Sequence, residues 1–190
     1  MKLICVNCSK ETNTFICSNC GYLNPLQEID FFSYLGISQN LNVDLNELEA
    51  NFLSLMSQYH PDNFVSKSKA EQHNATVHSS YLNKAYETLF DATKRFAYMY
   101  FLINGEEITE EIDSKNGSLF TEFLEYYEEL ENIQHTNNLK IFQEKLHSMK
   151  QDVLDENSDI DFKNKSVAYH VYVRLKYIDK IIESSKKLEM

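Results

Sequence analysis

Apolar residues recur at steps of three and four positions along most of the chain after residue 44, and this spacing constrains the fold most strongly. A period near 3.6 is that of one face of an α-helix. The chain also holds only 4 Gly and 2 Pro, which is few for a protein of many strands and tight turns. We therefore predict an all-α fold. The stripes are Leu45, Leu48, Phe52, Leu55, Met56 and Tyr59; Val77, Tyr81, Leu82, Ala85, Tyr86 and Leu89; Phe96, Ala97, Tyr100 and Ile103; Leu119, Phe120, Phe123, Leu124, Tyr127 and Leu130; Leu139, Phe142, Leu146, Met149 and Val153; and Val167, Val171, Leu175, Ile178, Ile181 and Ile182.

Turn and capping residues divide these stripes into segments. Asp30 and Gly36 are suited to begin and end a short helix. A longer helix begins behind Asp44 and ends near Tyr59–His60, since a residue that precedes proline is pushed out of the α region. Residues 61–69 are polar and loop-like, and a second long helical pattern follows with a bend near Asp91.

Asn24-Pro25 and Asn104-Gly105 mark the boundaries of the predicted domains. We expect a small cysteine-bearing segment at residues 1–25, a helical hairpin unit at 26–104 and an acidic linker at 105–117. The last three stripes fall in residues 118–190 and predict a C-terminal three-helix bundle.

The overall charge argues against one class of partner. The formal net charge is −11, and a broad nucleic-acid-binding surface needs Lys and Arg for phosphate contacts. No apolar run approaches the ~20 residues of a transmembrane helix, and no secretory signal is visible. We expect neither nucleic acid nor a membrane as partner, and a bacterial cytoplasm or, alternatively, a mitochondrial matrix as the compartment.

All four cysteines lie in two Cys-x-x-Cys pairs, Cys5/Cys8 and Cys17/Cys20. Two such pairs can close a tetrahedral site of four thiolates, the form that structural zinc prefers, although iron could use the same ligands. A segment of about 20 residues has too little core to fold alone, so a metal would supply the missing free energy. We predict one structural zinc ion, with no open position for catalysis.

His60-Pro61-Asp62 follows the predicted helix end and admits two interpretations. It can be an incidental polar turn, or His60 and Asp62 can form an acid–base dyad. The sequence shows no recognisable nucleophile elbow and no Gly-rich phosphate loop, so an enzyme is the weaker interpretation.

The context of this tripeptide resembles a J-domain. The parts that carry the resemblance are a short helix ending in Leu-Gly, a helix ending in "YHPD", a loop, and a helix containing "LNKAYETL". The stretches "DFFSYLGIS", "YHPDNF" and "LNKAYETLFDATKRFAYMYFL", with the acidic C-terminal helices, are similar to the HscB family of J-type co-chaperones of iron–sulfur cluster assembly. The two cysteine pairs match the subset of that family with a metal-binding N-terminal segment.

The resemblance implies a function without catalysis in this chain. His60, Pro61 and Asp62 would contact a DnaK/HscA-type chaperone, or its mitochondrial equivalent, and stimulate its ATP hydrolysis. The C-terminal bundle would bind the iron–sulfur scaffold protein IscU. The residues that match the scaffold-binding positions are Phe120, Thr121, Leu124, Glu125, Glu128 and Tyr177. For Phe120 and Leu124 core packing is an equal alternative, and for the two glutamates a solvated face is the usual arrangement.

The chain departs from the J-domain pattern in its charges. Residues 42–62 contain no Lys or Arg, and Asn63 stands where Lys is common. Lys67 and Lys69 can compensate in part. We expect the missing charge to weaken or slow docking to the chaperone more than it changes the stimulation of ATP hydrolysis by the docked protein. Thr121 is also more polar than the apolar residue expected there.

Two further functions stay open from the sequence. One is an enzyme that uses His60 or a thiol redox protein that uses the cysteines. The other is a general J-protein for other clients, whose C-terminal bundle only forms a homodimer.

Overall fold

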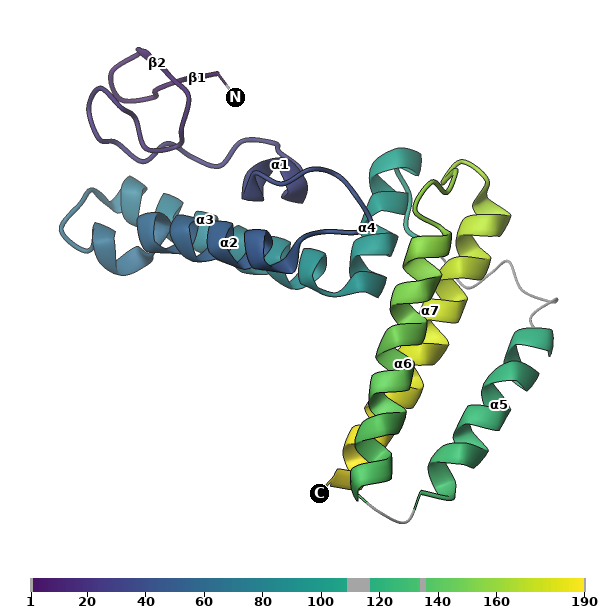
Figure 1. Ribbon diagram of the computed structural model, residues 1–190. Helices are drawn as coiled ribbons and strands as arrows, with labels where there is room; N and C mark the ends of the chain where they lie inside the picture. Colours follow the sequence, from purple (N-terminus) through teal and green to yellow (C-terminus); the bar gives the residue numbers. More distant parts are fainter. Residues whose placement is uncertain (1, 109–116, 134–135, 190) are drawn as a thin grey trace. The chain divides into compact units, whose positions relative to one another are not determined.

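The structure is a computed structural model that describes residues 2–108, 117–133 and 136–189 (Figure 1). Side chains are described throughout these ranges except at 117–120, 122, 136, 137 and 189. The predicted all-α fold is confirmed, and the only paired strands within these ranges are two of two residues each. The elements are β1 (Leu3–Ile4), β2 (Glu11–Thr12), α1 (Phe31–Leu35), α2 (Leu45–Tyr59), η1 (Pro61–Phe64), α3 (Lys69–Phe90), α4 (Ala92–Asn104), α5 (Gly117–Glu131), α6 (Thr136–Glu156), α7 (Lys165–Lys186) and η3 (Lys187–Glu189).

The chain divides into two compact units. Unit 1 comprises residues 1–39 and 43–91, and unit 2 comprises 40–42 and 92–190. The division falls where the sequence predicts a bend, because the backbone of Asp91 is extended (φ −79°, ψ 120°) and ends α3. Most of the expected linker, residues 109–116, lies outside the described residues.

Unit 1 is built on the pair of long helices α2 and α3, which lie side by side in Figure 1. The predicted caps are present, since Asp30 accepts a hydrogen bond from the Ser33 N–H and Gly36 adopts φ 69°. The apolar faces of the two helices meet, and they bury Leu48, Leu82 and Leu89 completely.

The loop expected at 61–69 is shorter than predicted. Residues Pro61–Phe64 form the 3₁₀ turn η1, and α3 begins at Lys69. A capping box begins α3, in which the Ser68 side chain accepts from the N–H of Glu71 and the Glu71 side chain accepts from the N–H of Ser68. This arrangement satisfies two of the unpaired donors of the first turn.

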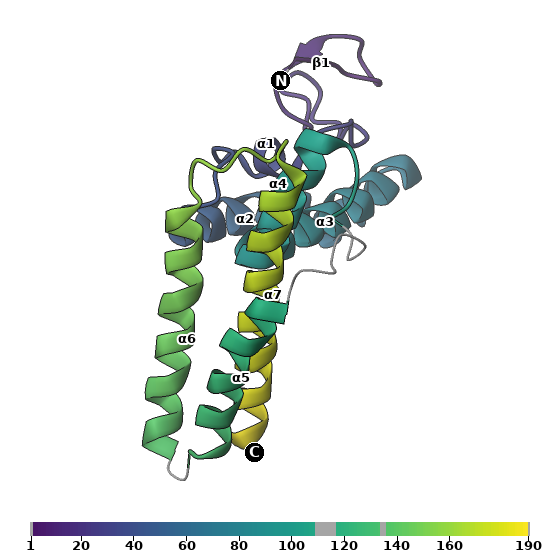
Figure 2. The same ribbon diagram turned by 90° about the vertical axis from the view of Figure 1, so that its right-hand side faces the viewer.

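Unit 2 is arranged around α7, which packs against α4, α5 and α6. Figure 2 shows that α6 and α7 are roughly parallel. The predicted three-helix bundle of α5, α6 and α7 is therefore present, with α4 added to it. A polar network joins three of the helices, since Asp179 accepts hydrogen bonds from the Thr93 hydroxyl at 2.6 Å and from Lys150 Nζ at 2.5 Å.

In the part of the chain that the structure describes, no helix combines the length and the apolar character needed to cross a membrane.

Candidate functional site

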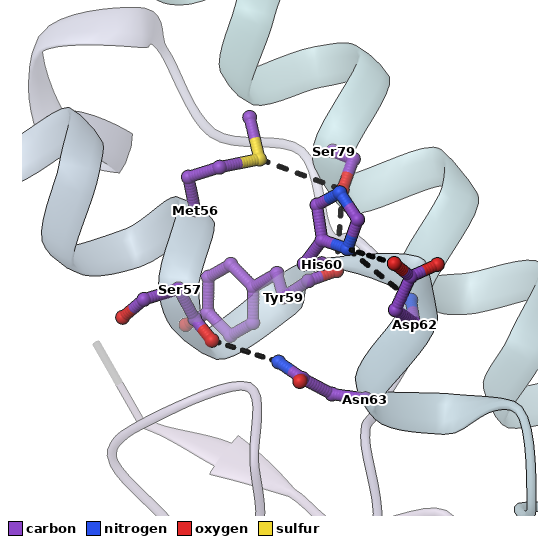
Figure 3. Close-up of polar contacts among 7 residues, drawn as sticks. All are labelled: Met56, Ser57, Tyr59, His60, Asp62, Asn63 and Ser79. Atoms are coloured by element: carbon purple, nitrogen blue, oxygen red, sulfur yellow. Dashed lines mark hydrogen bonds and ion pairs between the residues drawn. The ribbon is translucent and has the colours of Figure 1, made fainter.

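The His60-Pro61-Asp62 turn lies at the junction of α2 and η1 (Figure 3). Pro61 forces His60 into an extended conformation (φ −57°, ψ 132°), so α2 ends at Tyr59 as predicted. His60 Nδ1 accepts from the backbone N–H of Asp62 at 3.3 Å, which requires an unprotonated Nδ1. The Asp62 carboxylate lies 3.6 Å from the same nitrogen.

Contacts on both sides hold the backbone of this turn. Asn63 Nδ2 donates to the Ser57 carbonyl at 2.7 Å, and the Ser79 hydroxyl of α3 donates to the Tyr59 carbonyl at 3.2 Å (Figure 3). Tyr59 and Phe64, which flank the turn, are both buried. The turn is therefore a fixed corner whose backbone is anchored to α2 and α3.

The two polar side chains of this corner point into solvent. The side chain of His60 is 49% exposed and that of Asp62 is 84% exposed. An acid–base dyad normally works in a site that excludes water, whereas an exposed pair on a rigid corner is suited to contact with another protein. The geometry therefore favours a binding role over catalysis.

The exposed face of α2 beside this corner is uncharged along the line that leads to His60. Four exposed residues follow one another there at steps of three and four: Asn46, Ala50, Leu53 and Ser57. The one large apolar side chain among them, Leu53, is 57% exposed. Lys67 and Lys69, beyond the turn, are exposed. The cations nearest in sequence to the corner therefore lie on its α3 side.

The four cysteines come together as predicted. Their sulfur atoms all lie within 4.8 Å of one another, and the pairs Cys5–Cys20 and Cys8–Cys17 are each 3.7 Å apart. A tetrahedral zinc site with Zn–S bonds of about 2.3 Å has sulfur–sulfur edges of about 3.8 Å. Four thiolates at this separation fit one metal ion.

The surroundings of Cys5 favour the thiolate that a metal ligand must be. Burial acts to raise the pKa of its thiol, but the backbone N–H groups of Cys8 and Asn7, together with the thiols of Cys20 and Cys17, lower that pKa to about 6. A thiol with a lowered pKa is deprotonated more readily and so binds metal more readily.

The cysteine segment packs on α1, α2 and α3 within unit 1. Phe15 is 3% exposed and lies among Tyr34, Tyr59 and His78, with its ring centroid 4.6 Å from that of His78. The carbonyl of Asn24 accepts from His78 Nε2 at 2.9 Å. Because a carbonyl can only accept, the Nε2 atom carries the proton.

Sequence reasoning missed His78 as a structural centre. Its other ring nitrogen, Nδ1, pairs with the Tyr34 hydroxyl at 2.8 Å, and burial lowers the pKa of the imidazole. The available signal is its register, because His78 falls on the same face of α3 as the buried Leu82, Ala85 and Leu89. A polar residue on that face has to find buried partners.

The residues expected to bind a scaffold protein lie on α5 and α7. Thr121, Glu125 and Glu128 of α5 are exposed, and Leu124 is 41% exposed, so Leu124 is a surface residue rather than a core residue. The side chain of Phe120 lies outside the described part of the chain.

The predicted aromatic residue of α7 meets α5 at this place. The Tyr177 ring stacks on Phe123 with centroids 5.1 Å apart and an interplanar angle of 12°. Phe123 is fully buried and immediately precedes Leu124. Tyr177 is half-buried, and its ring contact on α5 is with Phe123, which is not one of the predicted binding residues.

Comparisons with known proteins agree with this arrangement. Residues 30–98 match the DnaJ domain family. The chain is 31% identical over 167 residues to the co-chaperone protein HscB of Proteus mirabilis, covering 85% of this chain and 96% of that protein. It is 30% identical over 175 residues to the iron–sulfur cluster co-chaperone protein HscB of Mus musculus, covering 90% of this chain and 74% of that protein.

The chain belongs to the HscB family of co-chaperones. Solved HscB structures share its fold: human HscB superimposes with a TM-score of 0.81 at 23% identity over 99% of both chains. HscB from Vibrio cholerae does so with a TM-score of 0.70 at 24% identity, over 85% of this chain and 98% of that one.

Membership of the HscB family assigns the chain a class of partner. Co-chaperones with a J-domain regulate a chaperone of the Hsp70 type and are regulators rather than enzymes. The HscB fold, with its J-domain and the four-cysteine cluster near the N-terminus, confirms the resemblance drawn from "YHPD" and the two cysteine pairs.

Proposed function

We propose that this protein stimulates ATP hydrolysis by a DnaK/HscA-type chaperone and delivers an IscU-type scaffold protein to it during iron–sulfur cluster assembly. The observation that carries this proposal is the fixed corner at His60-Pro61-Asp62, whose backbone is anchored and whose polar side chains face solvent. Such a corner can bias the ATP-bound state of a partner only because it presents its groups in one geometry.

The scaffold-binding role rests on the exposed residues of α5. Leu124 and Glu128 lie one turn apart, as do Thr121 and Glu125, so one helix face carries an exposed leucine, two glutamates and a threonine. An exposed leucine bordered by carboxylates suits a partner surface that combines an apolar pocket with cations. Phe120 and Tyr177 complete the proposed set.

The metal is proposed to be one structural zinc ion held by Cys5, Cys8, Cys17 and Cys20. The cluster supplies four sulfur ligands and lies in a segment with only a small core of its own, which is the setting of structural zinc. When bound, the ion cross-links the two cysteine turns.

The scaffold-binding proposal predicts the effect of one double substitution. Leu124→Ala with Glu128→Ala should weaken scaffold binding by roughly 30-fold or more, because loss of interface anchors costs about 2 kcal/mol or more. Isothermal titration calorimetry with an IscU-type scaffold measures the change. Both side chains are exposed, so the unfolding temperature should stay within about 2 °C of the wild type.

A matched control is available on α6. Ile141 is 59% exposed and Glu144 is exposed, and they are three residues apart, so that both lie on one face of α6. Ile141→Ala with Glu144→Ala should leave scaffold binding unchanged. If the α5 and α6 variants bind the scaffold equally well, the chain is a J-protein for another client, and a homodimer through the bundle becomes the alternative to test.

A further inference from the structure

The two cysteine turns are built alike, twelve residues apart. In the first turn the N–H of Cys5 donates to the Lys10 carbonyl at 2.9 Å, and the N–H of Ser9 donates to the Cys5 carbonyl at 2.9 Å. Ser9 has φ 57°, an unusual left-handed conformation for a residue other than glycine.

The second turn repeats these contacts. Cys17 donates to the Tyr22 carbonyl at 2.9 Å, and Gly21, with φ 71°, donates to the Cys17 carbonyl at 2.8 Å. Both turns also read Cys-x-Asn-Cys, so Asn7 and Asn19 occupy the same position in each.

The two asparagine side chains cross from one turn to the other. Asn7 Nδ2 lies 3.7 Å from Cys20 Sγ, and Asn19 Nδ2 lies 3.6 Å from Cys8 Sγ. Each asparagine of one turn therefore donates to the last cysteine of the opposite turn. Because the same contact occurs in two equivalent places, we take it as a regular feature of the cysteine cluster rather than a chance contact.

These amides reach the sulfurs that the fold protects least. The first cysteine of each turn, Cys5 or Cys17, is 1% exposed. The second cysteine is more open, since Cys8 is partly buried and Cys20 is exposed. The asparagine amides thus supply hydrogen bonds to the two ligands that burial does not shield from water.

Lys10 fixes the orientation of one of the two amides. Its ammonium group donates to Asn19 Oδ1 at 2.9 Å. An ammonium can only donate, so the oxygen of this amide must face Lys10 and the NH₂ group must face Cys8. The Asn19 amide therefore links the positive charge of Lys10 to the sulfur of Cys8.

We infer that Asn7 and Asn19 are positioning residues of the metal site, each holding and shielding the second, less buried cysteine of the opposite turn. This inference rests on the proposed metal binding by the four cysteines. A zinc ion with four thiolates carries a net charge of −2, and donated hydrogen bonds spread that charge and slow the departure of a thiolate. Partners of this kind typically contribute about 10- to 100-fold to metal affinity.

The test compares Asn7→Ala, Asn19→Ala and the double variant with the wild type. Asn13→Ala is the matched control, because Asn13 is an exposed asparagine of the same segment. Each protein is loaded with zinc, and its metal content is measured. Zinc release to a chromogenic chelator is then followed, and the four thiols are pulse-labelled with N-ethylmaleimide and mapped by peptide mass spectrometry.

Each substitution should affect the cysteine of the opposite turn. Asn19→Ala should raise labelling of Cys8 and Asn7→Ala should raise labelling of Cys20, each by about tenfold, while zinc release accelerates to a similar degree. The effect of Asn19→Ala should be the larger, because Lys10 orients that amide. Asn13→Ala should behave as the wild type.

Two results would overturn the inference while leaving the metal site intact. One is labelling that rises equally at all four cysteines, which would show only a loosened segment. The other is release and labelling in both variants that match Asn13→Ala. A wild-type chain that takes up no metal would instead overturn the proposed metal site, and the role of the asparagines with it.

Discussion

His60→Gln is expected to weaken stimulation of the chaperone ATPase by roughly 30-fold or more at limiting concentration while leaving the fold intact. The imidazole is half exposed on the fixed corner, so its replacement removes a contact group and little packing. Loss of a central contact of about 2 kcal/mol or more corresponds to a roughly 30-fold weaker effect at limiting concentration. Single-turnover ATP hydrolysis by a DnaK/HscA-type chaperone measures it.

His73→Gln is the matched control for this substitution. His73 is an exposed histidine of α3 in the same unit, four residues after the first residue of that helix. The His73→Gln variant should stimulate ATP hydrolysis as the wild type does. Both variants should unfold at the wild-type temperature. Equal stimulation by His60→Gln and the wild type would show that the corner is an incidental turn.

Removal of the metal is expected to destabilise unit 1 strongly. Without the cross-link, residues 1–24 lose the turns that hold Phe15 and Leu23, which are 3% and 0% exposed. Re-exposing two large apolar side chains costs about 3–6 kcal/mol in total. For a unit of this size, in which 1 kcal/mol shifts the melting temperature by about 4–8 °C, that corresponds to a fall of roughly 12–48 °C.

Differential scanning calorimetry with and without a zinc chelator measures this fall. Cys17→Ser supplies an independent version of the same loss, because Cys17 is a buried member of the proposed ligand set. The chelator should lower the melting temperature of the wild type and have little further effect on Cys17→Ser. A wild type that loses its metal yet melts at an unchanged temperature would contradict a structural role for the ion.

Much of the fold follows from local signals in the sequence. Pro61 ends α2 by a steric rule, Asp30 and Gly36 cap α1, and the apolar stripes select the buried faces of the long helices. The predicted start of α3 after residue 69 agrees to within one residue with the observed start at Lys69. The Ser68-x-x-Glu71 capping box was the local sign of it.

The parts that sequence could not supply depend on contacts between distant residues. His78 bonds to Asn24 and Tyr34, 54 and 44 residues away, and no spacing rule links these positions. The exposure of Leu124 likewise depends on how α5 packs on α7, because the apolar stripe alone allows either core or surface. The cysteine cluster was predictable because its ligands lie within a short segment.

The most direct test of the central claim is whether chaperone stimulation and scaffold delivery are joined in this one chain. Single-turnover ATP hydrolysis by the DnaK/HscA-type chaperone would be measured with this protein, with an IscU-type scaffold, and with both. We predict that both together give a faster rate than the separate effects combined, and that Leu124→Ala with Glu128→Ala removes only the increment due to the scaffold. A rate with both partners that equals the rate with this protein alone would contradict the account.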